Sequence, residues 1–125
     1  MKAELQEKLV DKYPSLFIYL TEHGSGDLLL PICFGLEVGD GWYDLLDGLF
    51  AAMVQLGEDV RLTQVKEKFG RLRVYIDGGS DAVHDLIDEH EVLSGEICEV
   101  CGKSGWLHGT NWLMVRCEEC YKEGR

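Results

Sequence analysis

Proline is scarce and long apolar runs are missing in this chain of 125 residues. Only 2 residues are proline and 46% are apolar, a composition that supports a folded core and that disordered chains do not have. No run approaches the roughly 20 apolar residues that a bilayer-spanning helix needs. Residues 1–8 are charged and lack the apolar segment of a signal peptide. We therefore expect a soluble, cytoplasmic protein.

Motifs of catalysis are missing too. The chain contains no phosphate-binding loop, no nucleophile elbow and no dinucleotide-binding fingerprint. His84 and His90 are too far apart for the H-E-x-x-H pattern of zinc proteases. Cys33 lies within an apolar run, where a buried and unreactive thiol is the expected state. The sequence therefore predicts that the protein is not an enzyme, and we assign no catalytic residue.

Positive charge is scarce and unevenly distributed. The chain has 12 Lys and Arg residues against 23 Asp and Glu residues, which gives a formal net charge of −11. No Lys or Arg occurs between Lys12 and Arg61, nor between Arg73 and Lys103. An anionic protein repels the phosphate backbone, so the charge disfavours direct nucleic-acid binding and favours a basic partner protein.

Acidic residues in the two cation-free stretches are candidates for contact with such a partner. Asp81, Asp85 and Asp88 would line one face of a helix, where like charges repel and nothing nearby in the sequence compensates them. One interpretation is an ordinary solvated helix face. The alternative is a surface directed at a basic protein groove. The candidate partner-binding residues are Asp40, Asp44, Asp47, Asp81, Asp85, Asp88 and Glu89.

The acidic chain contains one cluster of basic residues, because five of its 12 basic residues fall within residues 61–73. If this segment forms a β-hairpin, Arg71, Arg73 and Tyr75 project from the same face, because side chains alternate along a strand. The cluster can bind phosphate or pair with the protein's own acids, and the sequence leaves both possibilities open. Its members are Arg61, Lys66, Lys68, Arg71 and Arg73.

Four of the five cysteines form two Cys-x2-Cys pairs. The pairs are Cys98 with Cys101 and Cys117 with Cys120, and 15 residues separate them. Such spacing lets both thiolates of a pair face one metal ion, and in a reducing compartment it indicates metal binding rather than disulfides. Four thiolates complete a tetrahedron, so we predict one structural Zn²⁺, with a redox or iron–sulfur site as the alternative. His108 could replace a cysteine, but we expect a solvated loop histidine.

Apolar periodicity predicts three helices. The helical spacing of apolar residues recurs over residues 2–13, 41–56 and about 81–93. Asp40 and Ser80 are expected to cap the second and third of these helices, because short polar side chains bond the free N–H groups of a first turn.

Strand patterns occupy other parts of the chain. Alternating residues predict a β-hairpin over 60–77 with its turn at 68–70. The apolar segment 28–34 is expected to be extended. A small second hairpin is expected to pair residues 106–107 with residues 112–115, between the two cysteine pairs.

These elements predict an α+β fold with two or three helices packed on a β-hairpin and a C-terminal zinc-ribbon-like module of four cysteines. Residues 1–95 would form an acidic α+β domain, and residues 96–125 the zinc-ribbon-like module packed on it. Helix 41–56 is expected to be the central core element. Its predicted core residues are Trp42, Leu46, Phe50 and Met53.

Three stretches stand out together. They are residues 39–46 (Gly-Asp-Gly-Trp-Tyr-Asp-Leu-Leu), residues 65–75 (Val-Lys-Glu-Lys-Phe-Gly-Arg-Leu-Arg-Val-Tyr) and the cysteine pairs with Trp112 and Arg116 between them. This combination resembles small zinc-binding proteins encoded by phages and prophages, over most of the chain from about residue 33. The resemblance implies action on host machinery, in the cytoplasm of the host cell.

A small, acidic, zinc-containing protein of this kind is similar to anti-CRISPR proteins. The similarity implies an inhibitor that binds a basic, nucleic-acid-handling host protein, such as a Cas9-type nuclease, and blocks its nucleic-acid loading or activity. The alternative is a zinc-ribbon adaptor module in transcription or nucleic-acid processing. The acidic imbalance favours the inhibitor.

Overall fold

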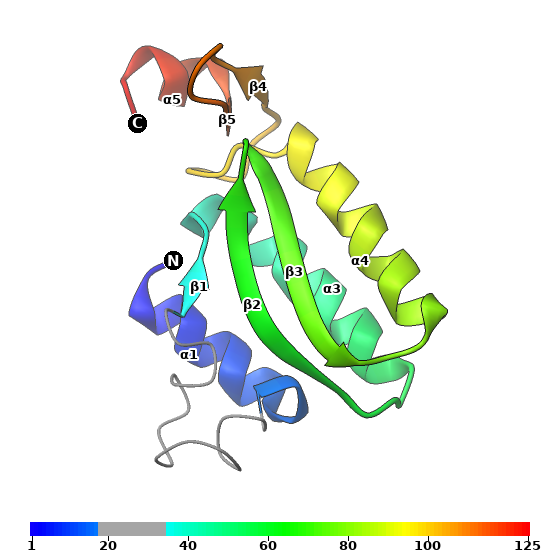
Figure 1. Ribbon diagram of the computed structural model, residues 1–125. Helices are drawn as coiled ribbons and strands as arrows, with labels where there is room; N and C mark the ends of the chain where they lie inside the picture. The colour runs from blue at the N-terminus through cyan, green and yellow to red at the C-terminus, as the bar shows by residue number, and fades with distance from the viewer. Residues whose placement is uncertain (18–34) are drawn as a thin grey trace.

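The computed structural model describes residues 1–17 and 35–125, so the predicted extended segment 28–34 and Cys33 lie outside the described residues. The elements, in chain order, are α1 (Ala3–Lys12), β1 (Leu36–Glu37), the 3₁₀ turn η1 (Asp40–Trp42), α3 (Tyr43–Gln55), β2 (Val60–Lys68), β3 (Arg71–Gly78), α4 (Asp81–Leu93), the 3₁₀ turn η2 (Ser94–Glu96), β4 (Trp106–His108), β5 (Met114–Arg116) and α5 (Glu118–Lys122). Figure 1 shows their arrangement. The predicted α+β class is confirmed, with helices on a β-hairpin and a four-cysteine module at the C-terminal end.

The hairpin β2–β3 is the larger part of a three-stranded sheet. β1 pairs in parallel with β2, and β2 pairs antiparallel with β3. Leu62, Val65 and Leu72 project from the inner face of this sheet, are fully buried and share one core with residues of α3 and α4. The turn consists of Phe69 and Gly70, inside the predicted residues 68–70. The three predicted helices correspond to α1, to η1 with α3, and to α4.

The free edge of β3 is closed by side chains from the end of α4. The backbone N–H groups of Leu72 and Val74 donate hydrogen bonds to Ser94 Oγ (3.1 Å) and Glu91 Oε2 (2.9 Å). Ser94 is fully buried, and its hydroxyl also donates to the carbonyl oxygen of Glu91. These bonds satisfy N–H groups that an exposed edge strand would offer to another chain. Polar as well as apolar contacts therefore fix α4 to the sheet.

Helix α3 is the central core element, as the sequence predicts. Its four predicted core residues are fully buried: Trp42, Leu46, Phe50 and Met53. Phe50 meets Tyr13 and Phe17 edge-on, with 6.0 Å between ring centroids in each pair. Edge-to-face aromatic pairs add to the burial of the rings, so Phe50 helps to hold the N-terminal segment on α3.

The predicted helix caps are wrong in detail. Gly39 precedes the first helical turn, and the Asp40 carboxylate instead accepts a hydrogen bond from the Lys2 backbone N–H (2.8 Å). Ser80 occupies the N-cap position of α4, but its hydroxyl donates to Glu58 Oε2 (2.7 Å) and does not cap the helix. In both cases a partner from a distant segment competes with the local backbone for the same polar group.

The carboxylate of Asp47 joins α3 to α1. It accepts hydrogen bonds from Lys12 Nζ (2.7 Å) and from the Tyr13 hydroxyl. These two donors, Lys12 first, lower the pKa of Asp47 below its usual value of 3.8. The ionised carboxylate is thus favoured in the folded protein relative to the unfolded chain.

Substitution of Phe50 by Ala tests the core assignment. Phe50→Ala should lower the free energy of unfolding by about 3–5 kcal/mol, because it removes a fully buried ring from a packed site. Val54→Ala on the exposed side of α3 is the matched control and should change it by less than about 1 kcal/mol. Thermal and urea unfolding followed by circular dichroism measures both. An unchanged Tm for Phe50→Ala would contradict the assignment.

Substitution of Asp47 by Asn tests the contact between α1 and α3. At about pH 7, Asp47→Asn should destabilise the protein by about 0.5–1 kcal/mol, because Lys12 loses its charged partner. The folded pKa of Asp47 is lowered, so its contribution is present above pH 3.8 and is lost as the pH falls through the folded pKa. The Tm difference from wild type should therefore shrink toward about pH 3. Asp44→Asn, exposed on the same helix and without an ion pair among the described residues, is the control and should change the Tm little at about pH 7; a difference for Asp47→Asn that is constant with pH would refute the account.

Candidate metal centre

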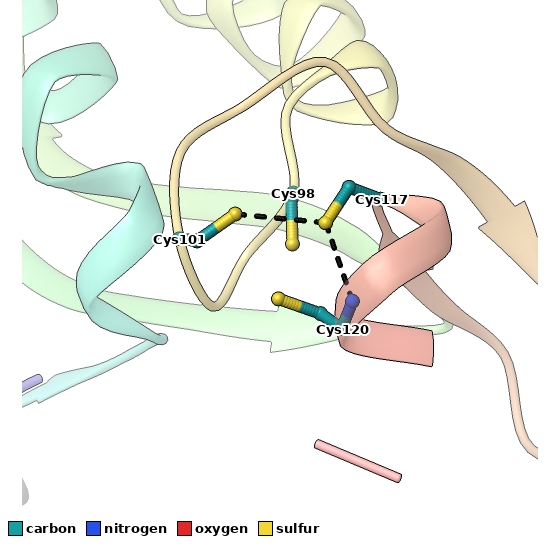
Figure 2. Close-up of side chains that lie close together, drawn as sticks. All are labelled: Cys98, Cys101, Cys117 and Cys120. Atoms are coloured by element: carbon teal, nitrogen blue, oxygen red, sulfur yellow. Dashed lines mark hydrogen bonds between the residues drawn. The ribbon is translucent and has the colours of Figure 1, made fainter. Parts of the chain in front are cut away.

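The first cysteine pair lies in a tight turn. The Gly102 N–H donates to the Cys98 carbonyl oxygen (2.9 Å), and the Cys98 N–H donates to the Lys103 carbonyl oxygen (2.7 Å). Gly102 has φ +82°, a left-handed conformation that glycine adopts without a steric cost. The turn places the Cys98 and Cys101 sulfurs on one side, as Figure 2 shows.

The second pair lies on a short helix that periodicity did not predict. Cys117 is the N-cap residue of α5, and its Sγ accepts a hydrogen bond from the Cys120 N–H (3.4 Å). The predicted small hairpin is present as β4 and β5, with Trp106 paired to Arg116 and His108 to Met114. It carries the chain from the turn of the first pair back to the start of α5.

The four sulfurs converge on one point. All four Sγ atoms lie within 4.8 Å of one another, and Cys101 Sγ and Cys117 Sγ are 3.6 Å apart. A tetrahedral zinc site with metal–sulfur distances of about 2.3 Å requires sulfurs about 3.8 Å apart. The cluster can therefore hold one metal ion, and its four-thiolate donor set is the one that zinc prefers in closed sites. The cysteines other than Cys101 are buried, so the protein covers most of the site.

The protonation of the sulfurs depends on backbone donors and burial. Burial alone would raise the pKa of Cys98, but backbone N–H groups of Cys101 and Cys117 point at its sulfur and lower the pKa to about 6. Burial and the neighbouring sulfurs raise the pKa of Cys120 to about 12. The raised pKa of Cys120 opposes full ionisation of the four thiols in the absence of a cation. Metal uptake therefore releases protons and weakens at low pH.

His108 is not the solvated loop residue that the sequence suggests. It lies on β4, is half-buried, and stacks on Tyr121 with 4.0 Å between ring centroids. His108 Nε2 lies 3.0 Å from the Arg116 carbonyl oxygen. His108 does not belong to the group of candidate metal ligands found in the described part of the chain. Its role is to pack α5 on the hairpin.

The turn of the first cysteine pair packs directly on the start of α3. The Gly41 N–H donates to the Glu99 carbonyl oxygen (2.8 Å), and Trp42 Nε1 donates to the Ile97 carbonyl oxygen (2.9 Å). A Cβ atom on Gly41 would lie 2.2 Å from the Cys98 carbonyl oxygen, and one on Gly39 would lie 2.3 Å from that of Glu99. The glycines of the Gly-Asp-Gly-Trp motif therefore allow two backbone segments to touch.

Glu99 is a site residue that the sequence analysis missed. Its Oε2 accepts the Gly39 N–H (2.9 Å), and its Oε1 lies 3.6 Å from Arg116 Nη1. Burial raises the pKa of Glu99, opposed by the Gly39 hydrogen bond and by Arg116. The one signal in the sequence is that Glu99 lies between Cys98 and Cys101, because a residue between two metal-binding cysteines belongs to the turn that holds them.

The seven candidate partner-binding acids do not form one surface. Four of them are exposed on α4: Asp81, Asp85, Asp88 and Glu89. Asp44 is exposed on α3, whereas Asp40 and Asp47 are half-buried and contact Lys2 and Lys12. The α4 acids are thus available for contact, and Asp40 and Asp47 are used within the fold.

The comparisons with known proteins assign no family. No protein-family model, no curated protein and no solved structure matches this chain. Within residues 1–17 and 35–125, none of the helices has the length and apolar character needed to cross a membrane.

A pair of glycine substitutions tests the contact between the metal turn and α3. Gly41→Ala should lower the Tm and release metal faster to a competing chelator, because the new Cβ meets the backbone of Cys98 and Gly102. Gly48→Ala on α3 is the control: nothing lies within 4 Å of its Cβ position, and alanine should stabilise the helix by about 1 kcal/mol. Gly41→Ala with wild-type Tm and metal retention would disprove the coupling.

Elemental analysis of the purified protein tests the metal site itself. It should give one metal per chain for wild type and a loss of metal for Cys101→Ser.

Proposed function

We propose that this chain is a non-enzymatic binding protein whose cysteine cluster holds one structural zinc ion and whose α4 docks on a basic, nucleic-acid-handling host protein. One observation carries the proposal. The exposed acids of α4, defined above, form no ion pair with any cation in the described part of the chain. We call them the α4 acidic face.

The structural role of zinc rests on the closed donor set. Four cysteines fill the tetrahedron, so a bound zinc ion keeps no position for water or substrate. The binding free energy of such sites, about 10–16 kcal/mol, is sufficient to fold a short module with few apolar contacts. The zinc ion would hold the turn of Cys98 and Cys101 against Gly41, and no chemistry on a substrate is required of it.

The α4 acidic face differs from the acids that form ion pairs within the fold. Asp47 pairs with Lys12, and Glu118 pairs with Lys122. On α4, repulsion between like charges at helical spacing destabilises the helix by a few tenths of a kcal/mol per pair. A basic partner would relieve this repulsion and gain electrostatic steering. Figure 1 shows α4 at the margin of the molecule, where a partner can reach it.

The host protein class follows from charge and from the sequence resemblance. A groove built for DNA or RNA is lined with cations, so an anionic helix can compete with nucleic acid for it. The resemblance to phage and prophage proteins supports an anti-CRISPR-like inhibitor of a Cas9-type nuclease. Such an inhibitor would block nucleic-acid loading or a movement needed for activity.

A zinc-ribbon adaptor in transcription or nucleic-acid processing is the second candidate. One observation favours it: the cysteine module exposes Trp106, Leu107 and Trp112, the last with 75% of its surface accessible. Exposed aromatic side chains of this kind commonly form contacts with partners. An adaptor would therefore bind through the module and not through α4.

Neutralising the α4 acidic face tests the proposal. The triple variant Asp81→Asn, Asp85→Asn, Asp88→Asn should associate more slowly with a purified Cas9-type nuclease at about 0.1 M salt, and the difference should fade as salt rises. Its zinc content should not change, and its Tm should stay the same or rise because helix repulsion is relieved. Biolayer interferometry and a DNA-cleavage assay measure binding and inhibition.

The matched control removes the same charge from another exposed helix face. Glu4→Gln, Glu7→Gln and Asp11→Asn on α1 should leave association unchanged. If the α4 variant binds and inhibits like wild type, the α4 acidic face is only a solvated surface. If binding survives that variant and is lost with Trp106→Ala and Trp112→Ala, the adaptor function replaces the inhibitor.

A further inference from the structure

The cations of the hairpin all project from the outer face of the sheet, opposite the core. Lys66 lies directly across from Arg73, and Lys68 directly across from Arg71, and opposed residues of antiparallel strands share a face. The register shifts between Leu62 and Gln64, which brings Arg61 onto this same outer face. We call these five residues the basic face.

Four members of the basic face have no ionic or hydrogen-bonding partner among residues 1–17 and 35–125. The side chains of Lys66, Lys68, Arg71 and Arg73 form no ion pair or hydrogen bond within the described residues. The Nε atoms of Arg71 and Arg73 are buried without an acceptor. Like charges placed directly across a strand pair destabilise it, and a buried donor without an acceptor adds a further cost. An anion bound on this face would accept hydrogen bonds from the two guanidinium groups and offset the repulsion between the cations.

The tip of the hairpin presents an aromatic ring beside these cations. Phe69 has φ +56° and 68% of its surface exposed, and Gly70 follows it with φ +77°. Two-residue turns with positive φ at both positions prefer Asn-Gly, and a bulky residue at the first position is strained. Lys68 Nζ lies 5.5 Å from the centroid of the Phe69 ring. The strained backbone of Phe69 lowers the stability of the fold, and strained positions of this kind are typical of binding sites.

A hollow of about 310 Å³ lies next to the tip. Its lining combines ring faces and polar groups: Glu67, Lys68, Phe69, Asn111, Trp112 and Leu113. The hollow is thus bordered by exposed aromatic rings from two different segments, with a cation of the basic face at its rim. A flat, apolar-faced group with polar edges fits such a lining.

We propose that the basic face and the hairpin tip bind single-stranded nucleic acid. Arg71 and Arg73 would contact successive phosphates, because same-face side chains repeat every ~6.7 Å along a strand. Lys66, directly across from Arg73 on β2, would add a second cation beside the phosphate at Arg73. Phe69 and Trp112 would stack on bases at the tip. Cations beside exposed aromatic rings are the usual means of holding a single strand without reading its sequence. An acidic peptide would satisfy the cations but offers no flat rings to stack on Phe69.

The net charge of −11 does not prevent this binding. α4 packs against the inner face and the edge of β3, so the sheet separates the α4 acidic face from the basic face. The Debye length at 0.1 M salt is about 10 Å, which screens charges on the far side of a layer. The inference concerns a different face from the proposed protein contact and does not depend on it.

Fluorescence anisotropy of a labelled oligothymidylate of about 16 nucleotides, at about 50 mM salt, tests the proposal on the full chain. Arg71→Gln with Arg73→Gln should weaken binding at least about tenfold and reduce the slope of log affinity against log salt by about 1.4, as expected for two lost phosphate contacts. Phe69→Asn should weaken binding about fivefold or more while stabilising the turn, which separates stacking from folding.

The control removes two exposed cations elsewhere, Lys8→Gln with Lys103→Gln, and should leave binding near wild type. Wild-type protein that fails to bind the oligonucleotide at this salt would overturn the proposal, as would equal losses in the control. If polyglutamate displaces the oligonucleotide as well as unlabelled oligonucleotide does, the face takes an acidic protein and the nucleic-acid assignment fails. None of these outcomes uses the nuclease, so they are independent of the test of α4.

Discussion

The backbone of Gly39 and Gly41 lies directly against the turn that carries Cys98 and Cys101, with a Gly41 N–H to Glu99 oxygen distance of 2.8 Å. Two main chains approach this closely only where no Cβ intervenes, so the contact requires glycine. On one side of it lie η1, whose Trp42 is fully buried in the core, and the helix α3 that follows; on the other lies the cysteine cluster. The core and the metal module therefore depend on each other, and the Trp42 hydrogen bond to Ile97 extends the same seam.

Charge is separated by the layers of the fold. The inner face of the hairpin is apolar and covered by helices, its outer face carries the cations, and the exposed side of α4 carries acids. Acids near cations, such as Asp47 beside Lys12, are used to join α1 to α3. The α4 acidic face and the side chains of Lys66, Lys68, Arg71 and Arg73 form no ion pairs among the described residues, and these two surfaces suit partners of opposite sign.

The cysteine cluster fits a structural zinc ion better than a reactive site. Its four sulfurs already supply a complete tetrahedron. The pKa values of Cys98 and Cys120 are displaced in opposite directions, because backbone donors outweigh burial at Cys98, whereas burial and the neighbouring sulfurs act together at Cys120. A divalent cation resolves that conflict by stabilising all four thiolates. The proposed functions are accordingly functions of surfaces, and a metal ion bound by the four cysteines would contribute by fixing the module to α3.

The sequence by itself determined the periodic and the short-range features: the α3 core stripe through Phe50, the hairpin with its turn at Phe69, and the two cysteine pairs. Each of these features depends on the spacing of residues that lie close together in the sequence, and that spacing can be read from the sequence alone. Tertiary structure decided which polar groups meet. The side chains of Asp40 and Ser80 form hydrogen bonds with Lys2 and Glu58 instead of with the helix backbone. Glu99 is largely buried and accepts a hydrogen bond from the Gly39 N–H. A strand register shift placed Arg61 with the other cations. These outcomes depend on contacts between segments tens of residues apart, because a polar group bonds whichever partner the folded chain brings within reach.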